Sequence, residues 1–214
     1  QRQMCIRDRN KDYTGTDKTE GRSLNGFGIN YAHGFGVAEN MFVEVGGNFN
    51  FGFGSEKGEK VEYAGYWFQD KQKMTNINLR VPVNFVYRFN VSDDFKIAPY
   101  VGINFKLNLV TKMKDVVDSN LSKDELKDLG YEEPDWVNVY SDSKENMGDG
   151  DYTWNRFQMG WQIGVGFEYQ KYYLGVQYGT DFIPAYSHKF EWDGGSSKPK
   201  INSQALKISL GYTF

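Results

Sequence analysis

The sequence predicts an all-β protein, an antiparallel up-and-down transmembrane β-barrel of eight strands, seven of which are clear in the sequence. Three observations predict this fold. Large apolar residues alternate with small or polar residues over seven separate stretches. The connections between these stretches alternate between short and long, which is typical of barrels that span a membrane. The apolar set is also too bulky for the interior of an eight-stranded barrel.

The seven stretches share one pattern, in which large apolar residues occupy one face of an extended strand and small or polar residues occupy the other. In "NGFGINYAHGF", for example, Phe27, Ile29 and Tyr31 alternate with glycine and asparagine. The stretches are residues 25–35, 41–54, 76–89, 95–109, 156–169, 173–182 and 206–214. A period of two that persists over each whole segment predicts strands rather than helices.

The connections predict where the missing strand belongs. Short connections fall at 37–40, 90–94 and 170–172, and long ones at 55–73, 112–153 and 183–201. A truncated connection at 10–22 places an eighth strand before residue 10. One interpretation is that residues 1–9, whose "MCIRDR" resembles a translated sequencing-adapter remnant, are a foreign segment in place of a lost signal peptide and first strand. The alternative is that "RQMCIRD" fills the strand position. Residues 10–214 are expected to form a single barrel domain.

The volume of the side chains predicts which face of the barrel looks outward. An eight-stranded barrel has an interior just wide enough for side chains to fill. The apolar set places about five to seven large residues on each strand, too many for that space. The opposite set, rich in Gly, Asn, Gln and Ser, fits a narrow lumen. We therefore expect the aromatic face to contact lipid, as in a bacterial outer membrane.

The terminal strand is expected to close the barrel. Backbone groups that face hydrocarbon find no water, so a spanning sheet can have no open edge. This explains why "LKISLGYTF" keeps its alternation up to a terminal aromatic residue. The strand resembles the β-signal that the bacterial outer-membrane assembly machinery recognises, and the residues that carry the resemblance are Leu206, Ile208, Leu210, Tyr212 and Phe214. The assembly machinery and outer-membrane lipid are thus expected partners.

A family resemblance adds to this interpretation. The segment "NLRVPVNFVYRF", followed by a short turn and "IAPYVGINFKLNL", resembles the Bacteroidota outer-membrane β-barrel (PorT-like) family. The resemblance covers residues 76–109 and extends more weakly over 155–214. It implies an eight-stranded barrel in a Gram-negative outer membrane. It implies little about activity, since fold does not determine function.

Seven charged residues are expected inside the barrel as a lumen charge network. Glu44, Arg88, Lys96 and Glu168 lie near the short-turn rim on four neighbouring strands, and Arg80, Lys106 and Lys207 lie further toward the long loops. Buried charges need partners, so we expect ion pairs across the lumen at the short-turn end. Such pairs would either plug the lumen or form a gate or proton path. The second group would hold a small anion or pair with Asp181 and loop carboxylates.

The longest connection is acidic and carries local structure. Residues 112–153 contain 12 acidic and 5 basic side chains. Within it, "SKDELKDLG" predicts a short helix with Ser122 as N-cap, Glu125 completing a capping box and Gly130 past the end. Trp136 is expected either to pack on this helix or to contact a partner. The "GDGD" at 148–151 lacks the spacing of an EF-hand.

Aromatic anchors are expected at both membrane surfaces, because amphipathic rings favour the headgroup region. The long-loop set is Tyr66, Trp67, Trp154 and Trp192, and the short-turn set is Tyr87, Tyr169, Tyr172 and Tyr212. Pro82 and Pro99 each remove one ladder hydrogen bond, so a β-bulge is expected near one of them.

Three functional hypotheses follow. The first is an outer-membrane scaffold that presents long loops for surface interaction or serves as an accessory subunit of an envelope complex, with an envelope protein as partner. The second is a narrow channel for small solutes, and the third a lipid-modifying enzyme. His33 and His188, the two histidines, lack a recognisable nucleophile motif, although Ser187 adjoins His188. We therefore expect no enzyme activity. The net charge of −3, the single Cys5 and the absence of metal-ligand spacing predict no nucleic acid, metal or cofactor.

Overall fold

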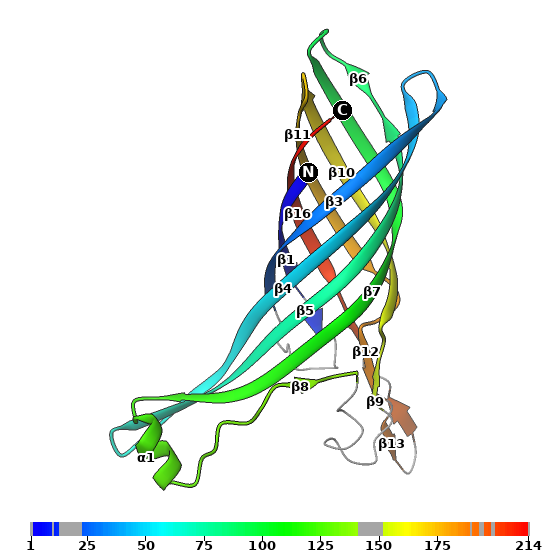
Figure 1. Ribbon diagram of the computed structural model, residues 1–214. Coiled ribbons are helices and arrows are strands. Elements are labelled where there is room, and N and C mark those ends of the chain that lie inside the picture. Colours follow the sequence, from blue (N-terminus) through cyan, green and yellow to red (C-terminus); the bar gives the residue numbers. More distant parts are fainter. Residues whose placement is uncertain are drawn as a thin grey trace.

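The computed structural model describes residues 2–9, 11–12, 23–140, 152–188, 190–192, 195–197 and 200–213. Within these residues, eight long antiparallel strands form a closed ring (Figure 1). They are β1 (Arg2–Arg9), β3 (Ser23–Ala38), β4 (Met41–Tyr63), β5 (Tyr66–Tyr87), β7 (Phe95–Ser119), β10 (Phe157–Tyr169), β11 (Tyr172–Asp181) and β16 (Gln204–Tyr212). Each strand pairs with the next, and the pairing of β16 with β1 closes the ring. The predicted fold class is confirmed.

The first strand of the ring is β1, as in the second of the two alternatives for the N-terminus. It pairs with β3 from Arg2 opposite Asn30 to Arg9 opposite Ser23. On its other edge it pairs with β16, from Gln3 opposite Leu210 to Asp8 opposite Ala205. The foreign origin of residues 1–9 and the domain limits of 10–214 stay predictions.

The short elements lie at the strand ends. The two-residue strand β6 (Phe89–Asn90) follows β5, and β8 (Val137–Asn138) pairs with β7. Beyond the long-loop end of the ring, β2 (Lys11–Asp12), β15 (Lys200–Asn202), β12 (Tyr186–His188) and β9 (Tyr152–Trp154) form a small second sheet. A hairpin of β13 (Phe190–Trp192) and β14 (Gly195–Ser197) and the helix α1 (Lys123–Asp128) complete the described elements.

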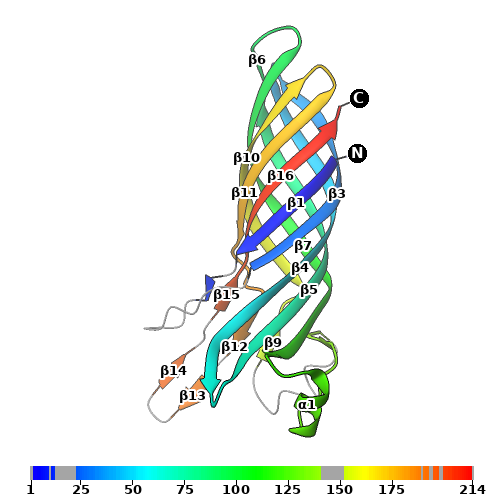
Figure 2. The same cartoon turned by 90° about the vertical axis from the view of Figure 1, so that its left-hand side faces the viewer.

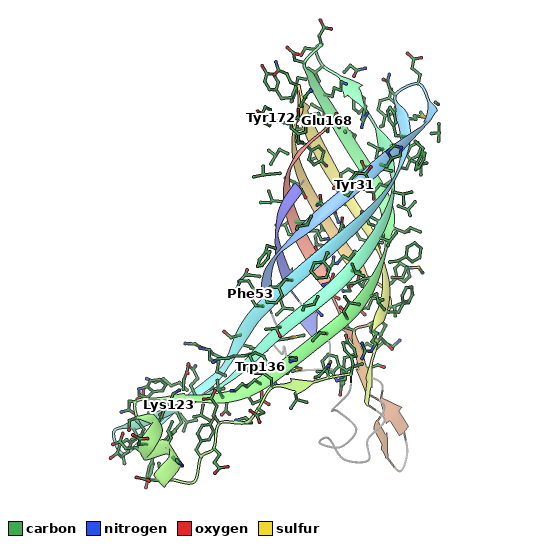
Figure 3. The ribbon with its side chains drawn as sticks, viewed as in Figure 1. Tyr31, Phe53, Lys123, Trp136, Glu168 and Tyr172 are labelled. Carbon is green, nitrogen blue, oxygen red and sulfur yellow. The ribbon has the colours of Figure 1, made fainter. Side chains whose placement is uncertain are left out.

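The orientation predicted from side-chain volume is confirmed. Aromatic and aliphatic side chains on the seven strands from β3 to β16 of the ring point outward and stay exposed, for example Phe27 (53%), Ile163 (51%) and Leu210 (60%). Figure 3 shows Tyr31 and Phe53 on the outside of the barrel wall. The buried set is instead polar and includes Asn50 and Gln162, at 0% and 2% exposure. An apolar exterior around a polar interior is the arrangement that lipid, rather than water, stabilises.

The expected long loop at 55–73 is almost entirely strand, and the one at 112–153 begins with strand as far as Ser119, so this part of the prediction is wrong. Strands β4, β5 and β7 continue well past the barrel and form a three-stranded sheet, which we call the arm (residues 54–75 and 111–119). Figures 1 and 2 show the arm slanting away from the barrel axis at the long-loop end. Its apolar alternation fades because outward positions such as Lys71, Lys73 and Lys112 are polar. Ala64 and Gly65, with φ of 52° and 83°, form the tight turn that joins β4 to β5.

The arm also corrects two smaller expectations. Tyr66 and Trp67 lie at its tip, about 30 Å of strand beyond Phe53 and Thr75, and are therefore not anchors at the barrel rim. The β-bulge expected at a proline is absent from the described strands at both positions. Pairing stays in register across Pro82 and Pro99. Opposite Pro99 the ladder between β7 and its neighbour is interrupted, because the pairing with β5 ends at Val86 and the pairing with β6 begins at Phe89.

The predicted helix is confirmed as α1. The Ser122 hydroxyl accepts a hydrogen bond from the Glu125 N–H, and the Glu125 carboxylate accepts one from the Ser122 N–H at 2.7 Å, which completes the capping box. Gly130 follows with φ of 84°. Trp136 is 39% exposed and lies nearer the barrel than Lys123 at the start of α1 (Figure 3). Among the described residues, no helix is long and apolar enough to cross a membrane.

Candidate functional site

The centre of the lumen is occupied by a buried ion pair. The Lys106 ammonium donates to the Asp181 carboxylate and also to the Ser203 hydroxyl, at 2.9 Å. Ser203 in turn donates to Asp181 at 2.8 Å and accepts from the Gln158 amide at 3.1 Å. The side chains of Lys106 and Asp181 are 4% and 5% exposed. Of the two alternatives for Lys106, the structure has the pair with Asp181.

Amide side chains extend this network along the barrel. Toward the short turns, Gln162 donates to Asn84 at 2.6 Å and accepts from Gln177 at 2.8 Å. Gln177 also accepts a hydrogen bond from the Tyr100 hydroxyl at 3.3 Å. These four side chains come from four consecutive strands of the ring, β5, β7, β10 and β11. Two of the bonds, Gln162 to Asn84 and Tyr100 to Gln177, reach past an intervening strand.

A second branch runs toward the long loops. Asn50 donates to Asn78 at 3.0 Å, and the Arg80 guanidinium donates to the same Asn78 oxygen at 3.2 Å. Asn108 bridges to Gln158 at 2.8 Å and thereby joins this branch to the central ion pair. The network holds these side chains in place, because each lost partner would leave a buried polar group unpaired.

Two tyrosine rings fill the short-turn half of the lumen. The Tyr173 ring lies against Gly166 and Gly175, where an added Cβ would come within 2.6 and 2.7 Å of it. The Tyr100 ring lies against Gly164 in the same way, with an added Cβ at 2.5 Å. The inward-facing glycines of β10 and β11 therefore make room for these rings.

An apolar lid covers the opposite end of the lumen. Val139, which is 2% exposed, packs with Leu24, Met74 and Met113, and Tyr140 and Trp154 pack against this cluster. The segment is tied to the barrel by the Val139 N–H, which donates to the Thr111 carbonyl at 3.0 Å. We call residues 137–140 the strap. Burial raises the pKa of Tyr140, so its phenol stays neutral.

A small cavity lies inside the barrel. Its volume is about 10 Å³, and it is lined by Arg80, Asn104, Gln177, Asp181 and Ser203 together with Gly179, Gln204 and Ala205. This volume holds about one water molecule. At this level of the lumen, the described side chains therefore leave little free space.

The four charges expected near the short-turn rim are only partly brought together. Arg88 lies 3.6 Å from Glu168, and its guanidinium stacks on the Phe42 ring at 4.3 Å. Lys96 is directly opposite Glu168 in the strand register, and the Glu44 carboxylate accepts a hydrogen bond from Asn84 at 3.5 Å. Figure 3 shows Glu168 close to the short-turn end of the barrel.

The remaining predicted site residues lie on β16. Lys207 is 1% exposed and faces the lumen between Gln177 and Ile6 of the neighbouring strands. The assembly-signal residues Leu206, Ile208, Leu210 and Tyr212 are exposed on the outside, between 39% and 60%. Phe214 lies outside the described residues, and recognition by the assembly machinery stays a prediction.

The two histidines lie far apart along the fold. His33 is exposed on β3, where its ring contacts that of Phe35 at 4.8 Å. His188 ends β12 in the small second sheet, and its side chain lies outside the described residues; the neighbouring Ser187 is buried at 6% exposure. The described residues also contain no cluster of metal-ligating side chains.

The arm carries a groove. Its volume is about 620 Å³, and its lining comes from all three arm strands and from Tyr131, Glu132 and Pro134 after α1. The Tyr131 hydroxyl accepts a hydrogen bond from the Val117 N–H at 3.0 Å, which fixes this segment along β7. At the tip of the arm, Val61 and Tyr63 are 61% and 79% exposed.

Sequence reasoning missed the strap, the arm and Ser203. Alternation indicates only which face a residue occupies, and it carries no signal for a segment such as 137–140 that crosses the mouth of the barrel. The arm did leave a signal, since Lys71, Lys73 and Thr75 continue the outward period of β5. Because the side chains on both faces of this segment are polar, its sequence pattern predicts a loop and not a strand.

A family model agrees with this architecture. The family model described as "Outer membrane protein beta-barrel domain" matches residues 12–183, most of the chain. No curated protein matches the chain. Among solved structures, the chain is similar to the outer membrane enzyme PagL, with 12% identity over 98% of each chain and a TM-score of 0.42. It is also similar to Ail, the attachment invasion locus protein of Yersinia pestis, with 11% identity, coverage of 100% and 96%, and a TM-score of 0.39. Neisserial surface protein A gives 12% identity, coverage of 100% and 96%, and a TM-score of 0.37.

Proposed function

The chain belongs to the outer membrane protein beta-barrel domain family and is located in the bacterial outer membrane, and from this premise we propose that it is a non-conducting scaffold that presents its arm for interaction at the membrane surface. The observation that carries the proposal is the filled lumen. A barrel that conducts solutes needs a continuous water-filled path, whereas the described side chains around Lys106 and Asp181 leave a cavity for about one water molecule.

Obstruction at three levels supports a closed lumen. The strap with Val139 covers the long-loop end, the Lys106–Asp181 pair spans the centre, and Tyr173 occupies the short-turn half. Each level rests on a different kind of interaction, namely apolar packing, a buried ion pair and a ring seated on glycines. A single side-chain rotation therefore opens no path.

The arm supports the second half of the proposal. Cross-strand interactions make it a sheet with fixed geometry: Gln72 donates to Asp115 at 2.7 Å and Lys71 pairs with Asp118 at 3.4 Å. The groove of about 620 Å³ has the size of a binding site for a small ligand or peptide. The exposed rings of Tyr63 and Tyr66 at the tip are residue types that are enriched in protein interfaces.

Three finer assignments belong to the same proposal. We assign the chain to the PorT-like barrels of Gram-negative bacteria on the resemblance of residues 76–109. An envelope protein is the proposed partner of the arm, with the chain as an accessory subunit. No catalytic role is proposed, because the outward-facing His33 contacts a phenylalanine ring rather than a serine or a carboxylate among the described residues.

Planar-bilayer recording tests the closed lumen. The purified full-length chain is expected to insert without discrete conductance steps. A variant with Tyr100→Ala, Gln162→Ser and Tyr173→Ala removes three side chains from the short-turn half and serves as the comparison. Regular openings of the wild-type chain would refute the scaffold proposal and favour the solute channel.

The role of the arm is tested by shortening it. Replacing residues 57–71 with an Asn-Gly turn joins Glu56 to Gln72, which are directly paired, and leaves the barrel strands intact. A photo-crosslinking residue at Ser119 is expected to capture an envelope protein in intact cells only when the arm is present. Equal capture by both versions would contradict the proposed role of the arm.

A further inference from the structure

The arm has two faces of opposite charge. The strand register continues the outside of the barrel onto one face, which we call the outer face and which begins with Phe53, Thr75 and Lys112 side by side. The six lysines of the arm strands all occupy positions of the outer face: Lys57, Lys60, Lys71, Lys73, Lys112 and Lys114. The inner face, which continues the lumen side through Met74 and Met113, carries carboxylates and no basic residue in the described strands.

Lysines oppose one another directly on the outer face. Lys57 is paired with Lys71 across β4 and β5, and Lys73 is paired with Lys114 across β5 and β7. Like charges at directly opposed positions destabilise a sheet. Two such pairs on the same face are therefore unfavourable unless negative charge is supplied to that face.

Carboxylates of the arm supply only part of that charge. Lys71 pairs with Asp118 at 3.4 Å, and Lys114 pairs with Glu133 at 2.8 Å, which lowers the pKa of Glu133. In the part of the chain that the structure describes, Lys57, Lys73 and Lys112 have no carboxylate within ion-pair distance, and Lys73 interacts with Glu133 only at longer range. Lys57 and Lys112 are exposed and Lys73 is half-buried. The lysines of this face thus outnumber the carboxylates that neutralise them.

The position of these lysines indicates where the missing anion lies. Lys73 and Lys112 are within about 7 Å of strand from the outward side chains of Thr75 and Val110, and Lys57 is about 13 Å from Phe53. With strands tilted by roughly 45°, these lengths correspond to about 5 to 9 Å along the membrane normal. The headgroup layer on each side of the hydrocarbon is about 5 to 8 Å thick. The lysines therefore fall at the level of the lipid headgroups.

We propose that Lys57, Lys73 and Lys112 bind the phosphate groups of anionic lipid headgroups in the leaflet on the long-loop side. The face is continuous with the surface that the barrel already presents to lipid, and its lysines are spread along the sheet instead of converging on one pocket. A bilayer surface offers several phosphates over such an area, whereas a single free phosphate does not. The bound lipid would neutralise the opposed lysine pairs and hold the arm close to the membrane.

Lipid binding by the full-length chain in detergent micelles tests the proposal. Native mass spectrometry would count adducts of lipid A, a diphosphorylated acyl disaccharide, and of phosphatidylcholine as the zwitterionic probe. The test variant is Lys57→Gln, Lys73→Gln and Lys112→Gln. Its matched control, Lys123→Gln, Lys127→Gln and Lys200→Gln, removes the same charge from exposed positions off the outer face.

The test variant is expected to bind lipid A about 10- to 100-fold more weakly than the wild-type chain at low salt, since each lysine near an anionic surface contributes roughly a tenfold or smaller factor. The control variant and phosphatidylcholine binding are expected to change less than about twofold. An equal loss in both variants would overturn the proposal, as would equal binding of the two lipids by the wild-type chain. Displacement of lipid A by millimolar inorganic phosphate would show a free-phosphate site and overturn it as well. None of these outcomes depends on whether the lumen conducts.

Discussion

Removing Asp181 from the lumen is expected to destabilise the barrel strongly. The Asp181→Leu variant removes the carboxylate that pairs with the Lys106 ammonium, which is only 4% exposed and keeps its hydrogen bond to the Ser203 hydroxyl at 2.9 Å. Ser203 loses its own acceptor at the same time. Leaving one charge of a buried pair without its partner costs about 3–5 kcal/mol. The free energy of unfolding, measured by urea titration of the chain folded in lipid vesicles, should fall by about that amount.

The double variant Lys106→Met, Asp181→Leu separates the charge effect from packing. Replacing a buried ion pair by apolar groups of similar volume is often close to neutral, so the double variant should recover most of the loss. The expected coupling energy between the two positions is about 3 kcal/mol. If the two single losses simply add in the double variant, the buried pair is not what stabilises the centre of the lumen, and the reasoning is refuted.

Three further predictions follow from other parts of the fold. Gly102→Ala places a Cβ 2.2 Å from the Val83 carbonyl oxygen and should lower the free energy of unfolding by more than about 2 kcal/mol, whereas Gly47→Ala, with no atom within 4 Å, should change it by less than about 1 kcal/mol in the same urea titration. Hydrogen bonds from Ser122 lower the pKa of Glu125 below its ordinary value of 4.5, so the stabilisation of α1 is complete above that pH and is lost as the pH falls below it. Amide hydrogen exchange in α1 should accelerate over that range in the wild-type chain but not in Glu125→Gln. Val139→Asp puts a carboxylate into the apolar lid and should expose a cysteine introduced at Thr111 to thiol reagents, and an unchanged labelling rate would show that the strap is not the seal.

The sequence alone determined the barrel and its orientation. Alternation depends only on local geometry, because neighbouring side chains of a strand point to opposite faces whatever the strand pairs with. The size of Phe49, Trp161 and Leu210 against the small size of their neighbours then decided which face meets lipid. Closure by the last strand followed from the lipid environment, because lipid hydrocarbon offers no hydrogen bonds to an open sheet edge.

Only the tertiary structure decided how far the strands run and what fills the barrel. Residues 55–73 have polar side chains on both faces, so their period of two disappears from the hydropathy pattern although the ladder continues. The contact of Lys106 with Asp181, and the row formed by Lys57, Lys73 and Lys112, bring together residues from different strands. Such contacts depend on the register between strands and on the bulge after Ile77, both of which are set by the pairing of whole strands rather than by any residue's own neighbours.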